Sequence, residues 1–380
     1  MSINNQSVEL CLVPVAIPGE KPYDVAIGTG LLPALHQQLQ SLFNGRSYRP
    51  FLITSPNIWA LWSEQVRASF PEARSPKVLF LPSGEKHKRL PAVEDLAEQL
   101  AEAGADRDAL LIAFGGGVIG DITGFLAAIY MRGVPYVQIP TTLLAQVDSS
   151  VGGKTGVNLA AGKNLIGSFN HPLTVLADTG LLGTLPAREL RSGLQEAVKA
   201  AVIHSTTFFE YLERHKVDIR NAELESLAHV VRKSVEIKAE VVVADEREAG
   251  RRMILNFGHT LGHAIESVTE YRELLHGEAV AWGSIGALHL GLARGSITHE
   301  QFDRISQLIL AFGPLPRFQT SAERLVERSA SDKKMRSGRR AFVLPTGIGQ
   351  VEIVHDVTDA ELLVAADAMM QTMKKAGEDL

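Results

Sequence analysis

The amino-acid sequence predicts an α/β protein with an amino-terminal Rossmann-like domain, built on a parallel sheet, and a mainly helical carboxy-terminal domain. Short β-branched runs alternate with helical patterns in the first half of the 380-residue chain. After about Leu182, almost only helical periodicity remains as far as Phe312. We therefore expect domains at residues 1–182 and 183–380, and the hydrophobic content of 45% is enough for sizeable cores.

The elements of the first domain are predicted from short apolar runs and the residues that flank them. The run at residues 109–114 is apolar almost throughout, which is typical of a central parallel strand. Pro91 opens an amphipathic helix whose apolar positions Val93, Leu96 and Leu100 share one face. The predicted strands lie at residues 51–54, 78–81, 109–114, 135–139 and 173–176.

The second domain is predicted to be helical, with long helical stretches at residues 193–215 and 224–243. Two late runs, at 341–344 and 351–354, are strand-like, and turn residues such as Gly338 and Gly347 flank them. We expect these two runs to be the strands of an otherwise helical domain.

Composition and charge exclude several classes of function. The 38 basic and 43 acidic side chains give a formal charge of -5, which offers no general attraction to nucleic acid or to a membrane surface. The one cysteine, Cys11, excludes an internal disulfide and favours a reducing compartment. Residues 1–9 lack a signal-peptide pattern, and no apolar stretch reaches the roughly 20 residues that span a bilayer. We expect a cytoplasmic protein that binds neither nucleic acid nor membrane.

Residues 115–121 form a glycine-rich turn between a predicted strand and a predicted helix. Their sequence, Gly-Gly-Gly-Val-Ile-Gly-Asp, matches the pattern G-x-G-x-x-G, in which glycines let the backbone approach a pyrophosphate. The acid that usually follows about 20 residues later is absent, because residues 136–146 contain no Asp or Glu. The turn therefore departs from an ordinary Rossmann site, and the alternative is a tight turn that needs glycines for packing alone.

Residues 148–164 combine lysines, amides and glycines without hydrophobic periodicity, and we expect a loop there. Lys154, Lys163 and Asn164 are donors that suit an oxyanion-rich ligand, and Asp148 is a candidate to orient a hydroxyl group. The alternative is a solvated loop whose lysines serve solubility. The glycine content of the segment favours the ligand-binding interpretation.

A candidate metal site combines one acid and two imidazoles. His259 and His263 are four residues apart, so they share one helix face, and His276 begins a further predicted helix. Glu196 is an acid within a mostly apolar helical stretch. A ligand set of Glu196, His259 and His276 leaves one position open for water or substrate, as catalytic zinc requires, and leaves His263 for proton transfer. The alternative for each histidine is a hydrogen-bonded residue of a helical core.

Together these motifs resemble the 3-dehydroquinate synthase family over about residues 57–349. Several independent motifs occur in the same order as in that family. The stretches are GGGVIGD and FLAAIYMRG within residues 115–133, PTTLLAQVDSSVGGKTGVN at 140–158, GKNLIGSF at 162–169, NFGHTLGHAIE at 256–266, HGEAVAWG at 276–283 and DKK at 332–334. The resemblance implies an NAD-binding α/β domain followed by a helical domain that binds metal.

The resemblance assigns site residues position by position. It implies that Glu196, His259 and His276 hold a divalent metal, zinc or cobalt. It places the sugar-phosphate substrate at Arg132, Asp148, Lys154, Asn164, Lys199, Lys238, Arg252, Asn256, His263 and one of Lys333 and Lys334. For NAD it implies Ser55, Asn57, Glu85, Lys88, Gly116, Gly117, Val118, Asp121, Thr141, Thr142, Lys154, Lys163, Leu181 and Thr184.

The implied reaction converts 3-deoxy-D-arabino-heptulosonate 7-phosphate into 3-dehydroquinate and phosphate, with NAD recycled within one turnover. His263 is expected to transfer a proton, and Lys199 and Asp148 are further members of the expected catalytic set. Glu248 is a second acid-base candidate, for which the alternative is a solvated acid in the charged run at 245–252. Arg132 matches an arginine that reaches the neighbouring subunit's site in dimeric relatives, so a homodimer is expected, with a monomer as the alternative.

Three other classes are the alternatives. A metal-dependent polyol dehydrogenase of the glycerol dehydrogenase kind has no use for anion-binding lysines, and Ala200 stands where its iron-type members place a histidine. Other sugar-phosphate cyclases act on substrates without a carboxylate, so Arg252 and Lys238 would be expected to change there. A non-catalytic homologue would be expected to lose part of the metal and proton-transfer set, which this sequence retains.

Overall fold

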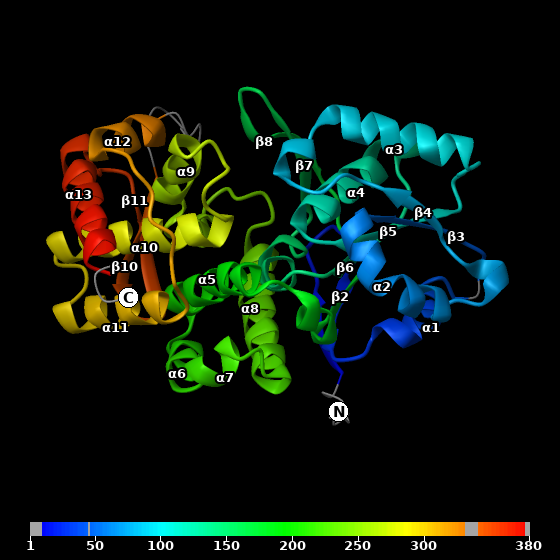
Figure 1. The fold of residues 1–380 in the computed structure, drawn as a ribbon, viewed down its shortest axis with the longest axis horizontal. Coiled ribbons are helices and arrows are strands. Elements are labelled where there is room, and N and C mark those ends of the chain that lie inside the picture. The colour runs from blue at the N-terminus through cyan, green and yellow to red at the C-terminus, as the bar shows by residue number, and fades with distance from the viewer. Residues whose placement is uncertain (1–9, 45, 331–340, 377–380) are drawn as a thin grey trace. The chain divides into compact units, whose positions relative to one another are not determined.

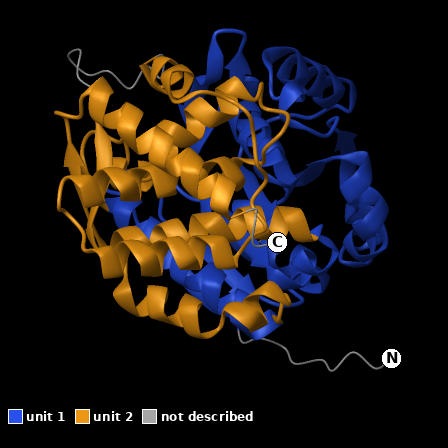
Figure 2. Cartoon of the chain, turned by 60° about the vertical axis from the view of Figure 1, so that its left-hand side comes forward, with its two compact units in different colours: residues 1–186, 224–243 blue, residues 187–223, 244–380 orange. Residues whose placement is uncertain are grey.

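The computed structural model describes residues 10–44, 46–330 and 341–376, and the chain divides into two compact units (Figure 2). Unit 1 comprises Met1–Pro186 and Leu224–Val243, and unit 2 comprises Ala187–Glu223 and Ala244–Leu380. The chain first leaves unit 1 close to the predicted boundary at residue 182. The segment Leu224–Val243 belongs to unit 1 by its contacts, although it lies within the predicted second domain. The division into an NAD-binding and a metal-binding domain stays a prediction.

Unit 1 is built on a seven-stranded sheet (Figure 1). Its strands are β1 (Cys11–Val15), β2 (Tyr23–Gly28), β3 (Arg49–Thr54), β4 (Lys77–Phe80), β5 (Ala109–Gly115), β6 (Tyr136–Pro140) and β9 (Thr174–Asp178). They lie in the order β1-β2-β9-β6-β5-β3-β4, and only the pair of β1 and β2 is antiparallel. The five strands predicted from the sequence are confirmed, and they form the parallel part of the sheet together with β2, which the sequence analysis does not predict. Every residue of β5 is buried.

Helices cover both faces of this sheet. The helices of unit 1 are α1 (Leu35–Leu42), α2 (Pro56–Ala68), α3 (Leu90–Glu102), α4 (Gly117–Ile129) and α8 (Leu224–Ala244). Successive residues of a strand point to opposite faces. Accordingly, Leu52 and Ile112 share a core with α1 and α2, whereas Phe51, Ile53 and Leu111 share a core with α3 and α4. The predicted Rossmann-like architecture is confirmed.

The strand order changes direction between β3 and β5. β4 follows β3 on one side, whereas β6 and β9 follow β5 on the other. In doubly wound sheets, ligands bind outside the carboxyl ends of the strands at such a switch point. The turn after β3 begins with Ser55 and the turn after β5 contains Gly116, so two of the predicted NAD segments lie at this position.

The prediction of a loop at residues 148–164 is wrong. The chain there contains a π-helical turn, Ala145–Ser149, followed by the strands β7 (Lys154–Leu159) and β8 (Gly162–Phe169), which pair as an antiparallel hairpin. Gly156 lies opposite Gly167, and a Cβ on either residue would overlap the backbone of the other strand. The glycines that suggest a loop are therefore required by the close approach of two strands.

Unit 2 is mainly helical, as predicted, with α10 at its centre. Its elements are α5 (Ala187–His204), α6 (Thr206–Arg214), α7 (Lys216–Arg220), α9 (His259–Val268), α10 (His276–Ala293), α11 (His299–Ala311), α12 (Ala322–Ala330), α13 (Asp359–Lys375), β10 (Phe342–Gly347) and β11 (Gln350–Val354). α10 contacts α5, α9, α11, α13 and β10, and its residues from Gly277 to Gly286 are all buried. The two late strands are confirmed as the antiparallel hairpin β10–β11.

The structure adds two features that the sequence analysis does not predict. The first is the hairpin of β1 and β2 at the edge of the sheet. The second is a break in the helical stretch predicted at 193–215, because the Ser205 hydroxyl accepts a hydrogen bond from Phe208 N at 3.2 Å and caps a new helix, α6.

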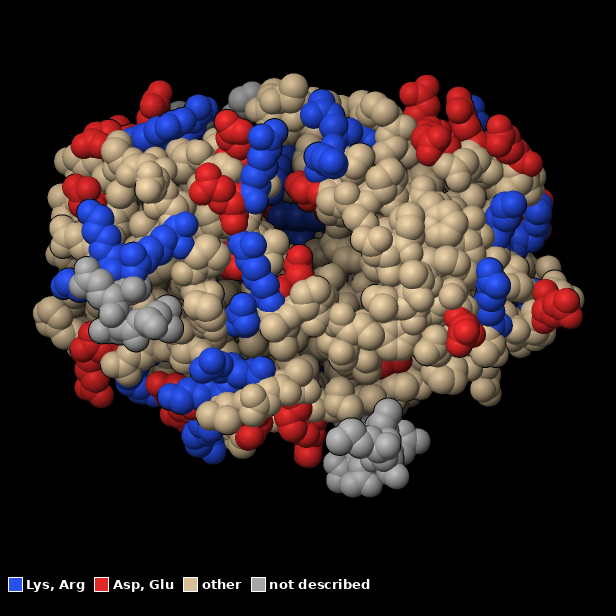
Figure 3. Space-filling view, viewed as in Figure 1, with Lys and Arg blue, Asp and Glu red and all other residues tan. Residues whose placement is uncertain are grey.

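The distribution of charged side chains on the surface and the apolar character of the helices bear on the binding classes considered above. On the face drawn in Figure 3, basic and acidic side chains occur together in several groups. Among the described residues, no helix has both the length and the apolar character that a bilayer crossing needs.

Asp178, the last residue of β9, ties two turns of unit 1 together. Its carboxylate is 3% exposed. It accepts hydrogen bonds from the backbone N–H groups of Gly30 at 2.9 Å, Leu31 at 2.7 Å, Leu32 at 3.1 Å and Gly180 at 2.9 Å. The carboxylate therefore fixes the turn after β9, which carries two of the predicted NAD contacts.

We predict that Asp178→Ala lowers the free energy of unfolding by about 3 kcal/mol, because it leaves buried N–H donors without an acceptor. Asp178→Asn keeps one carbonyl oxygen and should lose less. The measurement is urea denaturation of the ligand-free protein, with Asp95→Ala on the exposed side of α3 as control. Equal losses in Asp178→Ala and the control would show that the carboxylate has no such role.

Candidate active site

The predicted metal ligands lie together in unit 2. Glu196 is on α5, His259 is the first residue of α9 and His276 is the first residue of α10. The Nε2 atoms of His259 and His276 lie 3.8 and 3.6 Å from Oε1 of Glu196. One ligand atom from each residue lies within 4.8 Å of the other two, a spacing that one metal ion can bridge.

Glycines allow the three helices to approach closely enough for these ligands to meet. A Cβ on Gly283 of α10 would overlap the carbonyl oxygen of Gly258 and the backbone nitrogen of Gly262. A Cβ on Gly277 would overlap the carbonyl oxygen of Ser192 on α5. Gly258, which precedes α9, also has a φ of +75°, which L side chains rarely adopt. Backbone contact between the helices therefore sets the position of each ligand.

Hydrogen-bond acceptors orient both imidazoles. Nδ1 of His259 lies 3.1 Å from the carbonyl oxygen of Phe257, and Nδ1 of His276 lies 3.3 Å from Oε1 of Glu266. A ring whose Nδ1–H donates to such an acceptor presents the lone pair of Nε2. Both Nε2 atoms face Glu196, as ligands of a shared ion must.

The electrostatics of the cluster suit a cation. Burial lowers the pKa of His259 well below its usual value, and the positive charge of Lys199 acts in the same direction, so the ring is neutral at neutral pH. Lys199 Nζ pairs with Oε2 of Glu196. Oε1 of Glu196 is buried and accepts no hydrogen bond from any described residue. A buried carboxylate oxygen without a donor is unfavourable, so one acid and two neutral imidazoles fit a divalent ion with an open position.

His263 lies beside this cluster without belonging to it. Its ring centroid is 5.3 Å from that of His259 and 6.2 Å from that of His276. The side chain is partly buried on the same face of α9. The structure thus brings a third imidazole close to the predicted ligands, and its role in proton transfer stays a prediction.

Two of the predicted substrate residues of unit 2, Arg252 and Asn256, lie in the short 3-10 helix Arg251–Asn256 that precedes α9. Asp245 accepts hydrogen bonds from the backbone of Ala249 and Arg252, and although burial opposes it, these bonds hold its pKa below the usual range. Arg252 is 2% exposed. Asn256 Nδ2 donates to Oε1 of Glu248 at 2.6 Å, and Glu248 itself has a φ of +56°. The two candidates Asn256 and Glu248 are therefore in direct contact.

The predicted substrate residues of unit 1 are less closely grouped. Lys238 Nζ donates to Oδ1 of Asp148 at 2.7 Å and to its carbonyl oxygen at 2.6 Å. Lys154 is exposed at the start of β7, and Arg132 is exposed in a left-handed turn with a φ of +68°. Lys333 and Lys334 lie outside the described residues.

Most of the predicted NAD contacts lie at the carboxyl-end edge of the parallel sheet, whereas Asp121 lies within α4 and Lys154 and Lys163 lie in the β7–β8 hairpin. Each group at that edge follows the carboxyl end of a strand, which is where nucleotides bind in such sheets. The groups are Ser55 and Asn57 after β3, Glu85 and Lys88 after β4, Gly116, Gly117 and Val118 after β5, Thr141 and Thr142 after β6, and Leu181 and Thr184 after β9. Gly116 is the N-cap of α4 and makes no side-chain cap hydrogen bond, and a helix N-terminus of this kind suits an anion.

A polar network connects several of these residues. Lys88 Nζ donates to Asp121 at 2.5 Å and to Oδ1 of Asn164 at 2.6 Å. Asn158 Nδ2 donates to Glu85 at 2.8 Å, and its Oδ1 accepts from the backbone of Asn164 at 2.9 Å. Burial alone would lower the pKa of Lys88, but the charges of Asp121 and Glu85 outweigh it and raise the pKa. Lys88 therefore remains a cation in the site.

Two of the other predicted NAD residues make local hydrogen bonds, and the remainder differ in their exposure. The Ser55 hydroxyl caps α2 through Ile58 N at 3.5 Å, and the Thr142 hydroxyl accepts from Ala145 N at 3.2 Å. Lys163 is partly buried in β8, and Leu181 is buried, whereas Asn57 and Thr184 are exposed. The contacts of this group with a dinucleotide stay predictions.

Three residues of the site have no role in the sequence analysis. Glu266 contacts His276, the Ser192 hydroxyl accepts a hydrogen bond from Gly277 N at 3.1 Å, and Asn158 belongs to the polar network. Glu266 is seven positions after His259 and therefore lies two turns away on a similar face of α9. That spacing is the only signal in the sequence for its role, because nothing local indicates the contacts of Ser192 or Asn158.

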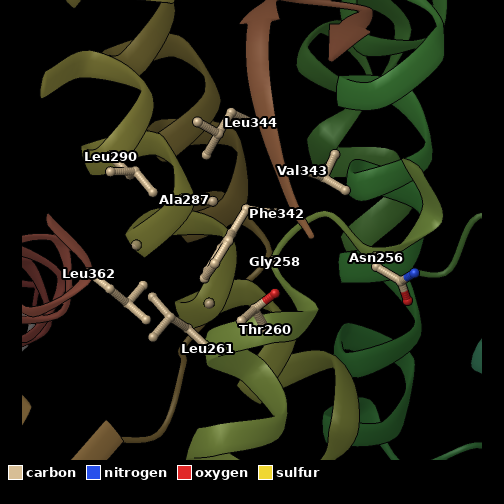
Figure 4. Close-up of a pocket in the computed structure, with 12 residues that line it drawn as sticks. Asn256, Gly258, Thr260, Leu261, Ala287, Leu290, Phe342, Val343, Leu344 and Leu362 are labelled. Carbon is tan, nitrogen blue, oxygen red and sulfur yellow. The ribbon is translucent and has the colours of Figure 1, made fainter. Parts of the chain in front are cut away.

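A small cavity lies behind the start of α9 (Figure 4). Its volume is about 20 Å³, enough for about one water molecule. Leu261 and Leu362 point toward one another on one side of it. The remaining lining is mostly apolar and includes Ala287, Leu290, Phe342 and Leu344. The cavity is too small for a substrate and belongs to the packing that supports α9.

Two family models match consecutive parts of this chain. The model of the amino-terminal part of 3-dehydroquinate synthase matches residues 78–192, and that of the carboxy-terminal part matches residues 193–335. A 3-dehydroquinate synthase of Solibacter usitatus is 45% identical over 342 residues, which cover 90% of this chain and 94% of the relative.

Solved structures of sugar-phosphate cyclases resemble this fold. The 2-epi-5-epi-valiolone synthase of Streptomyces hygroscopicus, with NAD+ and Zn2+ bound, has a TM-score of 0.84 and 30% identity, over 94% of this chain and 99% of that chain. A 2-deoxy-scyllo-inosose synthase has a TM-score of 0.82 and 24% identity over the same shares, and shows the shared fold.

We predict that Gly283→Ala lowers the free energy of unfolding by about 3 kcal/mol, because the added methyl group forces α10 away from α9. The same displacement should weaken binding of Co2+ to the metal-free protein. The matched control is Gly183→Ala, where a Cβ would meet no atom within 4 Å. Thermal unfolding and Co2+ titration check both effects, and an unchanged Gly283→Ala protein would show that the helix contact tolerates a side chain.

Proposed function

Because this chain belongs to the 3-dehydroquinate synthase family, we propose that it converts 3-deoxy-D-arabino-heptulosonate 7-phosphate into 3-dehydroquinate and phosphate. The proposed cofactors are NAD and one divalent metal, zinc or cobalt. The observation that carries the proposal is the convergence of Glu196, His259 and His276 from three different helices.

The metal site is proposed to act on a hydroxyl of the substrate. A divalent ion held there would supply Lewis acidity to that hydroxyl and to the carbonyl formed from it. The contribution of the chain is to hold Glu196, His259 and His276 in place and to keep His259 neutral. Lys199, beside Glu196, supplies a fixed positive charge next to the ligands.

The turn after β5 and the network around Lys88 are proposed to bind NAD. When bound there, NAD would supply reversible hydride transfer. The support is the arrangement of the predicted contacts after the carboxyl ends of parallel strands, together with the N-terminus of α4, whose N-cap is Gly116 and which suits a pyrophosphate. The cation of Lys88 is held by Asp121 and is suited to order the ligand.

Fixed cations are proposed to bind the two anionic groups of the substrate. Arg252 is almost fully buried and its Nη1 donates to the carbonyl oxygen of Glu246, so its guanidinium has a defined position. Lys238 is held by Asp148. Cations of this kind stabilise a carboxylate or a departing phosphate. A neutral polyol would have no use for them.

Two alternatives are weaker. In a glycerol-type dehydrogenase of the iron kind, a further histidine is expected at position 200, but Ala200 lies one turn after Glu196 on α5 and offers no ligand atom. Another sugar-phosphate cyclase activity is disfavoured by the retention of Arg252 and Lys238, for which a carboxylate-free substrate has less need. The homodimer expected from Arg132 stays a prediction, which sedimentation analysis would test.

The proposed reaction predicts that the purified chain releases phosphate from the heptulosonate phosphate with NAD in catalytic amounts. NADH should not accumulate, because the hydride returns to the product. A chelator should abolish phosphate release, and Zn2+ or Co2+ should restore it. Steady NADH formation with glycerol, without phosphate release, would instead establish the dehydrogenase.

A second prediction concerns His263. If this imidazole transfers a proton, His263→Ala should lower kcat by about 100-fold or more while the metal and NAD still bind. His299→Ala, which removes an exposed imidazole at the start of α11, is the control and should leave kcat unchanged. Full turnover by His263→Ala with both cofactors bound would remove this assignment.

A further inference from the structure

Glu266 is a buried acid that the proposed ligand set does not include. It lies on α9, is 3% exposed, and places Oε1 at 3.3 Å from Nδ1 of His276. Burying a carboxylate costs free energy unless hydrogen bonds or charges compensate it. The imidazole of a proposed metal ligand is one such partner, so the position of this acid relates it to the metal site.

Other groups already fix the backbone at the start of α10. Leu275 N donates to Oε2 of Glu278 at 2.7 Å, and Arg188 holds the same carboxylate through two hydrogen bonds of 2.7 Å. Gly277 N donates to the hydroxyl of Ser192. These contacts fix the main chain around His276, but none of them involves its imidazole. An acceptor at Nδ1 is what selects one orientation of the ring.

The two proposed imidazole ligands are oriented by different kinds of acceptor. The acceptor for His259 is the backbone carbonyl of Phe257, which no substitution removes. The acceptor for His276 is the side-chain carboxylate of Glu266. A charged carboxylate is a stronger acceptor than a neutral carbonyl. The contact with Glu266 therefore both directs Nε2 of His276 toward Glu196 and strengthens its donation to a cation.

We propose that Glu266 is a positioning residue that sets the affinity and the geometry of the metal site through His276. The proposal rests on the metal site proposed above and extends it by one residue. Loss of the carboxylate should weaken metal binding by about 10- to 100-fold, as is usual for a group that orients a metal-bound histidine. Glu266→Gln keeps an amide oxygen and should restore part of the affinity lost in Glu266→Leu.

The test uses the metal-free full chain and two readouts besides activity. Competition with a chromophoric chelator gives the Kd for Co2+ and Zn2+, and the visible absorption of the Co2+ form reports the coordination geometry. We expect wild type to bind most tightly, Glu266→Gln less tightly and Glu266→Leu least, with an altered Co2+ spectrum in both variants. Glu213→Gln is the matched control, because this carboxylate of unit 2 pairs with Arg304 at 2.6 Å. Its Kd and spectrum should equal those of wild type.

The outcomes separate this inference from the proposed function. Wild-type Kd and spectrum in both Glu266 variants would overturn the role of Glu266 and leave the metal site intact. A wild-type chain that bound neither ion would overturn the metal site and the role of Glu266 with it. Should Glu266→Leu fail to fold, as shown by thermal unfolding, Glu266→Gln decides, since an unchanged affinity and spectrum in that variant contradicts the proposal.

Discussion

The candidate metal site depends on how closely the backbones of α5, α9 and α10 can approach one another. Side chains normally keep helix axes about 8–10 Å apart. Gly258, Gly262, Gly277 and Gly283 remove those side chains where the helices meet, and a Cβ at Gly277 or Gly283 would overlap a backbone atom of a neighbouring element. Because two of the proposed ligands are the first residues of their helices, the position of each helix end is also the position of a ligand. The site is thus set by main-chain packing.

Orientation of the ligands is a separate requirement from their position. His259 and His276 each have an acceptor at Nδ1, and both present Nε2 to the same carboxylate oxygen. Burial keeps His259 neutral, while Lys199 pairs with the other oxygen of Glu196. A cation would satisfy the remaining oxygen and both lone pairs at once. This arrangement explains why so polar a cluster can lie among the apolar helices of unit 2.

The candidate dinucleotide site follows from the topology of the sheet in unit 1. In a parallel sheet the carboxyl ends of all strands lie at one edge, so turns that are far apart in the sequence meet there. Lys88 after β4, Asp121 in α4 and Asn164 in β8 are joined by hydrogen bonds at this edge. Asn164 reaches the network because β7 and β8 form a tight hairpin at Gly156 and Gly167.

The sequence by itself determined the class of fold, the parallel strands of unit 1, the helical character of unit 2 and the chemistry of the candidate ligands. Apolar periodicity is a local signal, and it predicted the fold class, five of the parallel strands and the helical character of unit 2 correctly, whereas the roles of the candidate ligands stay predictions. Local signals misled at residues 148–164, where glycines required by a tight hairpin suggested a loop. They also could not show that α8 belongs with unit 1. Only the tertiary structure decided that Glu196, His259 and His276 meet and that Glu266 contacts His276, because these contacts depend on the distances between helices, which no local pattern encodes.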